Sequence, residues 1–294
     1  MKALVIGGGG FLGSHVADAL VSAGHQVRIF DLHPSAYATP DQEVVIGNLL
    51  DATSIQQAVE GCDVVYNMAG IADLDDAMTR PITTVKLNIE GNVFALEAAV
   101  RAGCTRFIYA STIYVYSDKG GFYRCSKQAS ELYVEEYQQR YGLDFTILRY
   151  GTLYGPRSDD RNSVWRYLNQ ALRNGRITVI GTGTERREYI EVRDAARLAV
   201  DILSPEYCNS HVIITGHHPI KLSQLMRTIQ EIMNGAVEVE YEEEGNSDHY
   251  DLIPYSYMPK LGRKLTSNYF MDIGQGLLEL IHNMDESTKS DLNS

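Results

Sequence analysis

The chain has 294 residues, 44% hydrophobic and 22% charged, which is enough for one large domain or a domain with a smaller lobe. Its net charge of -12 argues against the basic surface that nucleic acids or anionic membranes require. No apolar run approaches the roughly 20 residues that span a bilayer, and the four cysteines share no metal-ligand spacing. We therefore expect a soluble, cytoplasmic protein without a metal site.

From residue 2 to about 149, short apolar runs alternate with amphipathic stretches, a pattern typical of parallel strands joined by crossover helices. The expected strands are 2–6, 26–30, 43–47, 63–67, 106–110 and 144–149, and the expected helices are about 11–23, 53–60, 83–102 and 124–141. The connections are short enough for right-handed crossovers. The pattern predicts an α/β fold, a doubly wound parallel sheet of the Rossmann type, over residues 1–155.

Beyond Gly155 and Pro156 the pattern becomes irregular. The expected elements there are helices near 162–174, 193–203 and 221–233 and strands near 177–180 and 211–215. They predict a smaller C-terminal substrate-binding lobe, mainly 156–284, with segments near 188–216 returning to the first domain. The glutamates of 238–244 indicate a solvated strand or loop face, and the polar segment 285–294 indicates a flexible tail.

A glycine-rich loop follows the first strand and opens the first helix. It runs from Gly7 to Gly13, and its candidate cofactor-binding residues are Gly7, Gly10, Phe11, Leu12 and Gly13. Backbone amides at a helix start can face a pyrophosphate, and small residues permit the close approach of backbone to phosphate. Gly13 would let the helix pack on the strand. The strand, loop and helix in this order predict a dinucleotide-binding turn.

Asp31 ends the second predicted strand, where a carboxylate can accept hydrogen bonds from the adenosine ribose and would repel a 2'-phosphate. NAD is therefore favoured over NADP as the cofactor. Arg28, inside the same strand, argues against this preference. The alternative role for Asp31 is to cap a turn.

Tyr123 and Lys127 stand four residues apart, so on a helix they share one face. A free phenol has a pKa of about 10, and a tyrosine base near neutral pH needs roughly 4 kcal/mol of stabilisation of its phenolate. One positive charge about 4 Å away contributes on the order of 4 kcal/mol at an effective dielectric near 20. After a nucleotide loop, the pair indicates hydride-transfer chemistry; the alternative is a solvated tyrosine and lysine.

With the glycine loop, Thr112 and the Tyr123/Lys127 pair in this order, the chain resembles the extended short-chain dehydrogenases/reductases of the NAD-dependent nucleotide-sugar epimerase/dehydratase family. The resemblance covers residues 1 to about 233. Its other specific pieces are ASTIYVY at 110–116, LRYGTLYGPR at 148–157 and GTGTERREYIEVRD at 181–194. It implies that Tyr123 is the catalytic acid/base, that Lys127 lowers its pKa and holds the nicotinamide ribose, and that Thr112 hydrogen-bonds the reacting sugar oxygen. Ser111 is the alternative hydroxyl.

The resemblance also assigns residues whose alternative role is packing. It implies cofactor contacts at Asn48, Leu49, Ala69, Gly70, Asn88 and Tyr150, and substrate contacts at Thr152, Arg157 and Arg187. Arg187 aligns with the arginine that binds a sugar-nucleotide diphosphate, and Arg157 is the second candidate. A homodimer through helices 83–102 and 124–141 is implied as well.

The residues after Thr112 bear on the reaction. Dehydratases and many decarboxylases resembling this family carry an acidic residue there, whereas this chain has Ile113 and Tyr114. We therefore predict C4 epimerisation of a nucleotide sugar through a transient 4-keto sugar. The alternatives are a dehydratase or decarboxylase, a reductase or dehydrogenase, and a non-catalytic NAD sensor. The connection 117–122 is shorter than in relatives, so we expect a more open active-site mouth.

Overall fold

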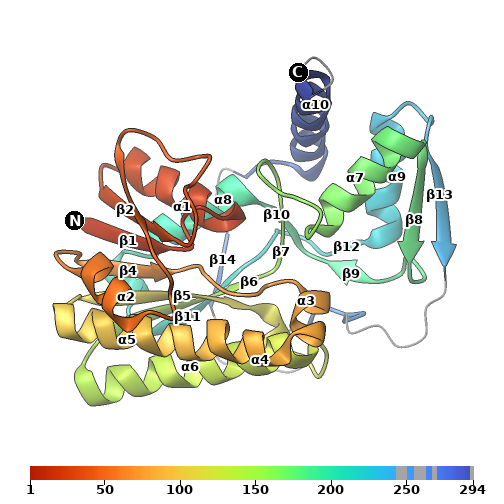
Figure 1. Ribbon diagram of the computed structural model, residues 1–294. Helices are drawn as coiled ribbons and strands as arrows, with labels where there is room; N and C mark the ends of the chain where they lie inside the picture. The colour runs from red at the N-terminus through yellow and green to blue at the C-terminus, as the bar shows by residue number, and fades with distance from the viewer. Residues whose placement is uncertain (243–249, 255–262, 267–269, 292–294) are drawn as a thin grey trace.

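The computed structural model describes residues 1–242, 250–254, 263–266 and 270–291. Within these residues, eight parallel strands form one sheet in the order β14-β11-β6-β5-β4-β1-β2-β3 (Figure 1). They are β1 (Lys2–Ile6), β2 (Gln26–Asp31), β3 (Gln42–Ile46), β4 (Val64–Asn67), β5 (Arg106–Thr112), β6 (Asp144–Tyr150), β11 (Ser210–Ile214) and β14 (Arg263–Leu265). The strand order reverses at β1, as in a doubly wound sheet. The predicted α/β fold is confirmed.

Helices cover both faces of the sheet. They are α1 (Phe11–Ser22) and α8 (Val192–Asp201) on one face, and α2 (Ala52–Val59), α5 (Gly91–Ala102) and α6 (Gly121–Tyr141) on the other. Ala3 and Val5 pack toward the first pair and Leu4 and Ile6 toward the second group, because successive side chains of a strand alternate between faces. Burial on both faces explains why the strands are almost continuous apolar runs.

The helix predicted over 83–102 is divided into shorter pieces. The elements that lead into α5 are α3 (Leu74–Thr79), α4 (Pro81–Thr84) and a π-helix, η1 (Val85–Glu90). Two 3-10 helices, η2 (Ile113–Tyr116) and η3 (Pro205–Tyr207), follow β5 and α8. π-helical turns are frequent at functional sites, and η1 carries Asn88.

A second lobe has its own apolar core (Figure 1, right). Its elements are α7 (Ser163–Asn174), β8 (Arg176–Ile180), α9 (Leu222–Ile232), β13 (Glu238–Glu242) and α10 (Ile273–Asp291). β13 pairs with β8, and the glutamates of β13 are exposed, while 243 and 244 lie outside the described residues. Helical structure continues through 285–291, within the segment predicted as a tail, and 292–294 lie outside the described residues.

Two small strand pairs join the lobe to the sheet. They are β7 (Thr152–Tyr154) with β10 (Tyr189–Glu191), and β9 (Arg186–Arg187) with β12 (Ile220–Lys221). Strands of two or three residues leave no periodic pattern, so the sequence did not predict them. None of the described helices is both long enough and apolar enough to cross a bilayer.

Candidate active site

The turn between β1 and α1 requires glycine at two positions. Gly7 has a φ of +77°, and a Cβ there would lie 2.7 Å from a backbone nitrogen after β4. A Cβ at Gly13 would lie 2.1 Å from the carbonyl oxygen of Gly7, so Gly13 permits α1 to pack against the turn. Gly10 is the N-cap and offers no side-chain acceptor. The N–H groups of Phe11 and Leu12 therefore have no intrahelical acceptor and suit an anion.

Asp31 lies against this turn at the end of β2. Its carboxylate accepts hydrogen bonds from the N–H groups of Gly9 (2.9 Å) and Leu32 (2.7 Å). Two carboxylate oxygens offer about four acceptor sites, so capacity for ribose hydroxyls is left. Arg28 is occupied elsewhere, because its guanidinium donates to two carbonyls near the end of α2 and pairs with Glu43 (2.9 Å). Because its guanidinium is engaged in these contacts, Arg28 no longer argues against NAD as the cofactor.

The turn after β4 is held by Asn88. Its Oδ1 accepts the Ile71 N–H (2.7 Å), and its Nδ2 donates to the Ile71 carbonyl and the Ser126 hydroxyl (both 2.9 Å). A Cβ at Gly70 would lie 2.5 Å from Asn88 Oδ1, and Ala69 precedes it in the same turn. The two amide hydrogens of Asn88 are used inside the protein. Asn88 therefore shapes the cofactor side of the site through this turn.

Three further residues predicted to contact the cofactor differ in burial. Asn48 is exposed, and its Oδ1 accepts the N–H of Leu50 (2.9 Å). Leu49 is buried against Gly91 of α5. Tyr150, at the end of β6, packs in the core beneath α1 and α8, and burial raises the pKa of its phenol. Its buried hydroxyl has no hydrogen-bond partner among the described residues.

Thr112, Tyr123 and Lys127 meet between the end of β5 and the first turns of α6, and all are buried. The Thr112 hydroxyl lies near the Tyr123 phenol and favours its ionised form. The Nζ atom of Lys127 lies 5.9 Å from the centre of the Tyr123 ring and 4.8 Å from that of Tyr109. It donates to the carbonyl of Ala110 (2.7 Å). The structure thus brings together the three residues predicted to be catalytic.

Burial dominates the pKa values of this pair. It raises the pKa of Tyr123 to about 12, against a smaller lowering by the Thr112 hydroxyl. It lowers the pKa of Lys127 to about 8, against a raising by the Glu131 carboxylate, so Lys127 is charged at pH 7. At 5.9 Å this charge supplies about 3 kcal/mol at an effective dielectric of 20. Lowering the phenol pKa to neutrality requires about 7 kcal/mol. Burial therefore adds to the stabilisation that the phenolate needs, beyond what the sequence expectation allowed for.

A buried polar network that sequence reasoning missed lies behind these residues. The Ser111 hydroxyl donates to Glu131 (2.5 Å), and Glu131 pairs with Arg149 (2.7 Å). Arg149 also donates to the Tyr116 hydroxyl (2.7 Å). Because Ser111 is engaged with Glu131, the geometry favours Thr112 as the hydroxyl that meets the substrate. A glutamate one helical turn after the lysine is the signal that could have revealed the network.

On the substrate side, Thr152 and Arg187 both contact Tyr250, which sequence reasoning also missed. The Thr152 hydroxyl lies near the Tyr250 phenol and lowers its pKa, against the larger raising by burial. The Arg187 guanidinium lies 4.2 Å from the centre of the Tyr250 ring. The ring of Tyr114 lies 4.9 Å from that of Tyr250 and 6.2 Å from that of Tyr123. Successive ring contacts therefore connect Tyr123, the predicted catalytic tyrosine, to Arg187.

Arg157 lies in different surroundings. Its backbone has a φ of +65°, and its guanidinium pairs with Asp18 of α1 (2.8 Å) and lies 4.7 Å from the centre of the Tyr37 ring. Nearby on α1, His15 donates through Nε2 to the carbonyl of residue 156 (3.0 Å), and burial lowers the pKa of His15 to about 4. Arg157 thus contacts the nucleotide-loop side of the first domain and none of the residues around Tyr250.

The short connection 117–122 forms a compact turn. Arg124 donates to the Ser117 carbonyl (2.9 Å), which closes the turn. Gly120 has a φ of +94°, and a Cβ there would lie 2.6 Å from the Tyr114 ring. The connection therefore packs against Tyr114 on the substrate side.

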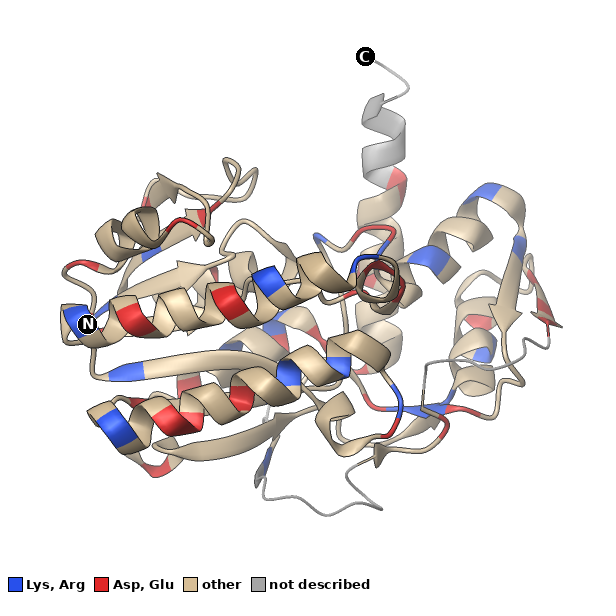
Figure 2. Cartoon of the chain, turned by 60° about the horizontal axis from the view of Figure 1, so that its bottom comes forward, with Lys and Arg blue, Asp and Glu red and all other residues tan. Residues whose placement is uncertain are grey.

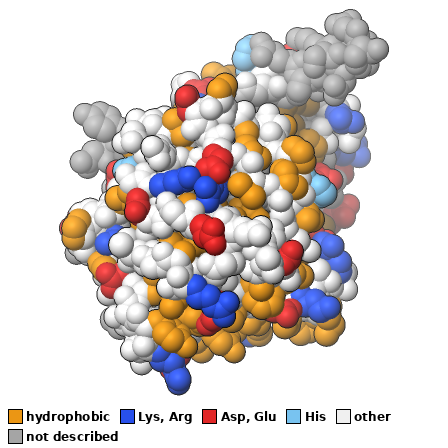
Figure 3. Space-filling view, turned by 60° about the vertical axis from the view of Figure 1, so that its left-hand side comes forward, with side chains coloured by type: hydrophobic (Ala, Val, Ile, Leu, Met, Phe, Trp, Pro, Cys, Tyr) orange, Lys and Arg blue, Asp and Glu red, His pale blue; other side chains and the backbone are white. Residues whose placement is uncertain are grey.

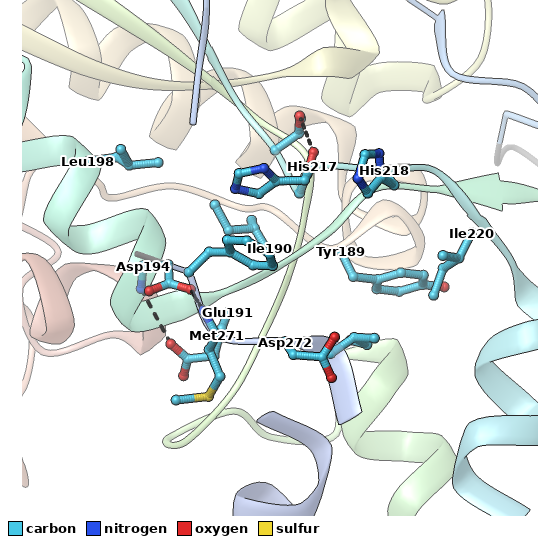
Figure 4. Close-up of a pocket in the computed structure, with 14 residues that line it drawn as sticks. Tyr189, Ile190, Glu191, Asp194, Leu198, His217, His218, Ile220, Met271 and Asp272 are labelled. Carbon is cyan, nitrogen blue, oxygen red and sulfur yellow. Dashed lines mark hydrogen bonds between the residues drawn. The ribbon is translucent and has the colours of Figure 1, made fainter. Parts of the chain in front are cut away.

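A separate cavity of about 200 Å³ lies between β10, α8 and the segments 215–220 and 270–273 (Figure 4). None of the residues predicted to be catalytic, cofactor-binding or substrate-binding lines it. Its buried carboxylates are engaged, since Glu191 caps α8 and Asp194 accepts the Met271 N–H (2.6 Å). In the described part of the chain, no three His, Cys, Asp or Glu side chains gather as a metal site requires.

The doubly wound sheet, the glycine turn and the buried threonine, tyrosine and lysine define a short-chain dehydrogenase/reductase. The sequence matches the NAD dependent epimerase/dehydratase family over residues 3–211, so the chain belongs to that family. The cofactor of the family is NAD. The site fits it, because the turn admits no side chain at Gly7 or Gly13 and the Asp31 carboxylate, which can accept further hydrogen bonds, lies against that turn.

Known relatives catalyse more than one reaction. UDP-N-acetyl-alpha-D-glucosaminuronate decarboxylase of Bacillus cytotoxicus is 29% identical over 260 residues, covering 79% of this chain and 78% of that protein. UDP-glucuronate 4-epimerase of Thermodesulfobacterium geofontis is 24% identical, covering 81% and 82%. The solved UDP-glucose 4-epimerase of Thermotoga maritima has a TM-score of 0.85 at 23% identity, covering 98% of this chain and 100% of that one. This structural likeness concerns the fold.

Proposed function

We propose that the protein epimerises C4 of a nucleotide-diphosphate sugar. One observation carries this choice: the buried Thr112 and Tyr123 hydroxyls lie near each other, and no acidic side chain follows them. Ile113 is buried in an apolar cluster, and Tyr114 packs against Tyr123. A dehydratase or decarboxylase must also assist a bond change at the carbon beside the oxidised one. The dehydratases and many decarboxylases that the sequence resembles carry an acidic residue for this step, at the position that follows Thr112 here.

In this proposal, NAD supplies the acceptor and donor of hydride when it is bound. Tyr123, as phenolate, takes the proton of the C4 hydroxyl while Thr112 hydrogen-bonds the same oxygen. Bound NAD would accept the hydride from C4 as the carbinol becomes a ketone, and would return it to the other face of the rotated 4-keto sugar. Tyr123 would then return the proton to the oxygen. The products are the C4 epimer and NAD, so no net oxidant is consumed.

The raised pKa of Tyr123 bears on how its phenolate is stabilised. Burial raises the pKa of Tyr123 to about 12, and the nearby ammonium of Lys127 favours the phenolate. A second positive charge near the phenol would favour it further, and the oxidised nicotinamide has that charge. We infer that Tyr123 becomes an effective base only when cofactor is bound.

Arg187 supports the choice of a diphosphate substrate. Among the described residues, it hydrogen-bonds the Arg186 carbonyl (2.9 Å) and stacks on Tyr250, and no carboxylate pairs with it. In a protein with a net charge of -12, an anionic ligand needs a charge-assisted donor of this kind. Thr152 lies beside it through their shared contact with Tyr250.

We also propose a homodimer through α5 and α6. Figure 2 shows the two helices side by side, with charged residues at intervals along both, and Figure 3 shows apolar side chains gathered toward the bottom of the molecule, where α6 lies in Figure 1. On α6, Leu132 is 65% exposed and Tyr133 is 45% exposed. Tyr137, between exposed tyrosines, is buried and donates to Glu97 of α5 (2.5 Å). Light scattering that shows a monomer at micromolar concentration would contradict this proposal.

The reaction is tested by incubating the protein with NAD and a panel of UDP- and dTDP-sugars, followed by anion-exchange chromatography, mass spectrometry and absorbance of NADH. We expect an isomer of unchanged mass, no accumulating NADH, and loss of turnover in Tyr123→Phe. Tyr133→Phe, on the exposed side of the same helix, is the matched control and should retain activity. Loss of water or carbon dioxide would establish the dehydratase or decarboxylase. Steady NADH growth would establish a dehydrogenase, and NAD binding without turnover would indicate a sensor.

A further inference from the structure

Tyr250 stands at the centre of the candidate substrate side. It is only 4% exposed, although it belongs to a short described segment far along the chain from the other site residues. Its ring contacts the Tyr114 ring and the Arg187 guanidinium, and its hydroxyl lies near that of Thr152. Three elements that are distant in sequence therefore converge on one side chain.

The backbone beside Tyr250 is anchored to the strand that carries Arg187. The carbonyl of Asp251 accepts the N–H of Arg186 (2.9 Å). Ile253 is buried in the apolar cluster that includes Ile113 of η2. On the other side, β9 pairs with β12, so the backbone at Arg187 is held by two neighbours. The contact between Tyr250 and Arg187 is thus built from two positioned backbones.

An aromatic ring that contacts the face of an arginine side chain fixes the orientation of its guanidinium. A guanidinium carries its N–H donors in its own plane, so contact through its face with an aromatic ring leaves the edge available to an anion. Arg187 uses one nitrogen, Nη1, on the Arg186 carbonyl. Without the ring, the long side chain would lose this orientation and would have to be ordered by the ligand itself.

We infer that Tyr250 is a positioning residue for substrate binding: its ring orients Arg187 toward the diphosphate of the nucleotide sugar. This inference rests on the proposed function. The ring acts on Arg187, and the hydroxyl acts on Thr152, so the two parts of the side chain can be tested separately. Tyr250→Leu removes the ring, whereas Tyr250→Phe keeps the ring and removes the hydroxyl.

The test measures binding of uridine 5'-diphosphate, thymidine 5'-diphosphate and the matching monophosphates by calorimetry, with NAD present. We expect Tyr250→Leu to weaken diphosphate binding about tenfold, as loss of a desolvated cation–π contact and of orientation implies. Tyr250→Phe should bind the diphosphate within about threefold of the parent protein. In an Arg187→Leu background, Tyr250→Leu should add little further loss, because the ring would have no guanidinium to orient.

NAD affinity and the circular dichroism spectrum report whether each variant is folded, and both should be unchanged in Tyr250→Leu. In the sugar-nucleotide reaction, the same variant should raise KM and leave kcat near the parent value. If Tyr250→Leu binds diphosphates as the parent does, or if its loss adds fully to that of Arg187→Leu, the inference is wrong while the proposed function stands. If the parent binds NAD but no nucleoside diphosphate, the proposed function fails together with the inference. A loss of NAD binding in Tyr250→Leu but not in Tyr250→Phe would show that the ring is structural, which also overturns the inference.

Discussion

Replacing Lys127 by Met tests the electrostatic argument directly, since the substitution keeps most of the length of the side chain and removes its charge. The Nζ atom lies 5.9 Å from the centre of the Tyr123 ring. At an effective dielectric of 20, loss of the charge raises the phenol pKa by about 2 units. On the acid limb of the pH profile, where the phenolate is scarce, kcat should fall about a hundredfold.

The assay is kcat against pH from about pH 6 to about pH 10 at saturating NAD and sugar nucleotide. The acid limb of Lys127→Met should move upward by about 2 units, so its deficit shrinks as pH rises. In the parent protein, the benefit of the ammonium should decline above pH 8, because the pKa of Lys127 is about 8. Lys86→Met removes an exposed charge from η1 and is the control. A deficit of the same size at every pH would refute the reasoning and leave Lys127 with a binding role alone.

Three further predictions concern the fold around the site. Gly13→Ala places a Cβ 2.1 Å from a carbonyl oxygen and should lower both the melting temperature and the affinity for NAD. Gly10→Ala, whose Cβ has its nearest atom at 3.4 Å, should keep the melting temperature and weaken NAD binding. Equal melting temperatures of the two variants would contradict the packing argument. Since the folded pKa of His15 is lowered to about 4, its neutral form contributes stability that is complete above the unfolded pKa near 6.5 and is lost as pH falls toward 4. Urea unfolding should show roughly 3 kcal/mol of this loss, because His15 is buried, and His15→Gln should lack it. Glu131→Gln leaves a buried arginine without its carboxylate and should reduce the free energy of unfolding by about 3 kcal/mol, while the surface variant Glu136→Gln should change it little; similar unfolding curves for both would contradict the network.

The first domain was largely predictable because local signals agreed with the tertiary fold. The apolar runs at 2–6, 26–30 and 144–149 form β1, β2 and β6, and the glycine loop connects β1 to α1. At such a position the chain itself dictates the geometry, since Gly7 and Gly13 admit no Cβ. Likewise, a spacing of four placed Tyr123 and Lys127 on one face of α6.

Contacts between distant segments were not predictable from local pattern. β9 and β12 have two residues each, so no periodicity marks them, and yet they fix the backbone that carries Arg187. The helix predicted over 83–102 contains a π-helix, η1, whose Asn88 is engaged with the turn after β4. A sequence comparison could name Asn88 but could not show where its amide hydrogens are used.

The sequence by itself predicted the parallel sheet, the dinucleotide turn and the candidate catalytic residues Thr112, Tyr123 and Lys127, because each pattern depends on residues that are close in the chain. Only the tertiary structure decided how acidic those groups are and what surrounds them. Burial, which is set by the whole fold, raises the pKa of Tyr123 and lowers that of Lys127. The same packing brings Tyr250 onto Arg187 across a long separation in sequence and places Arg157 against α1. Desolvation and long-range contact have no local sequence pattern, and for this reason they had to be read from the folded chain.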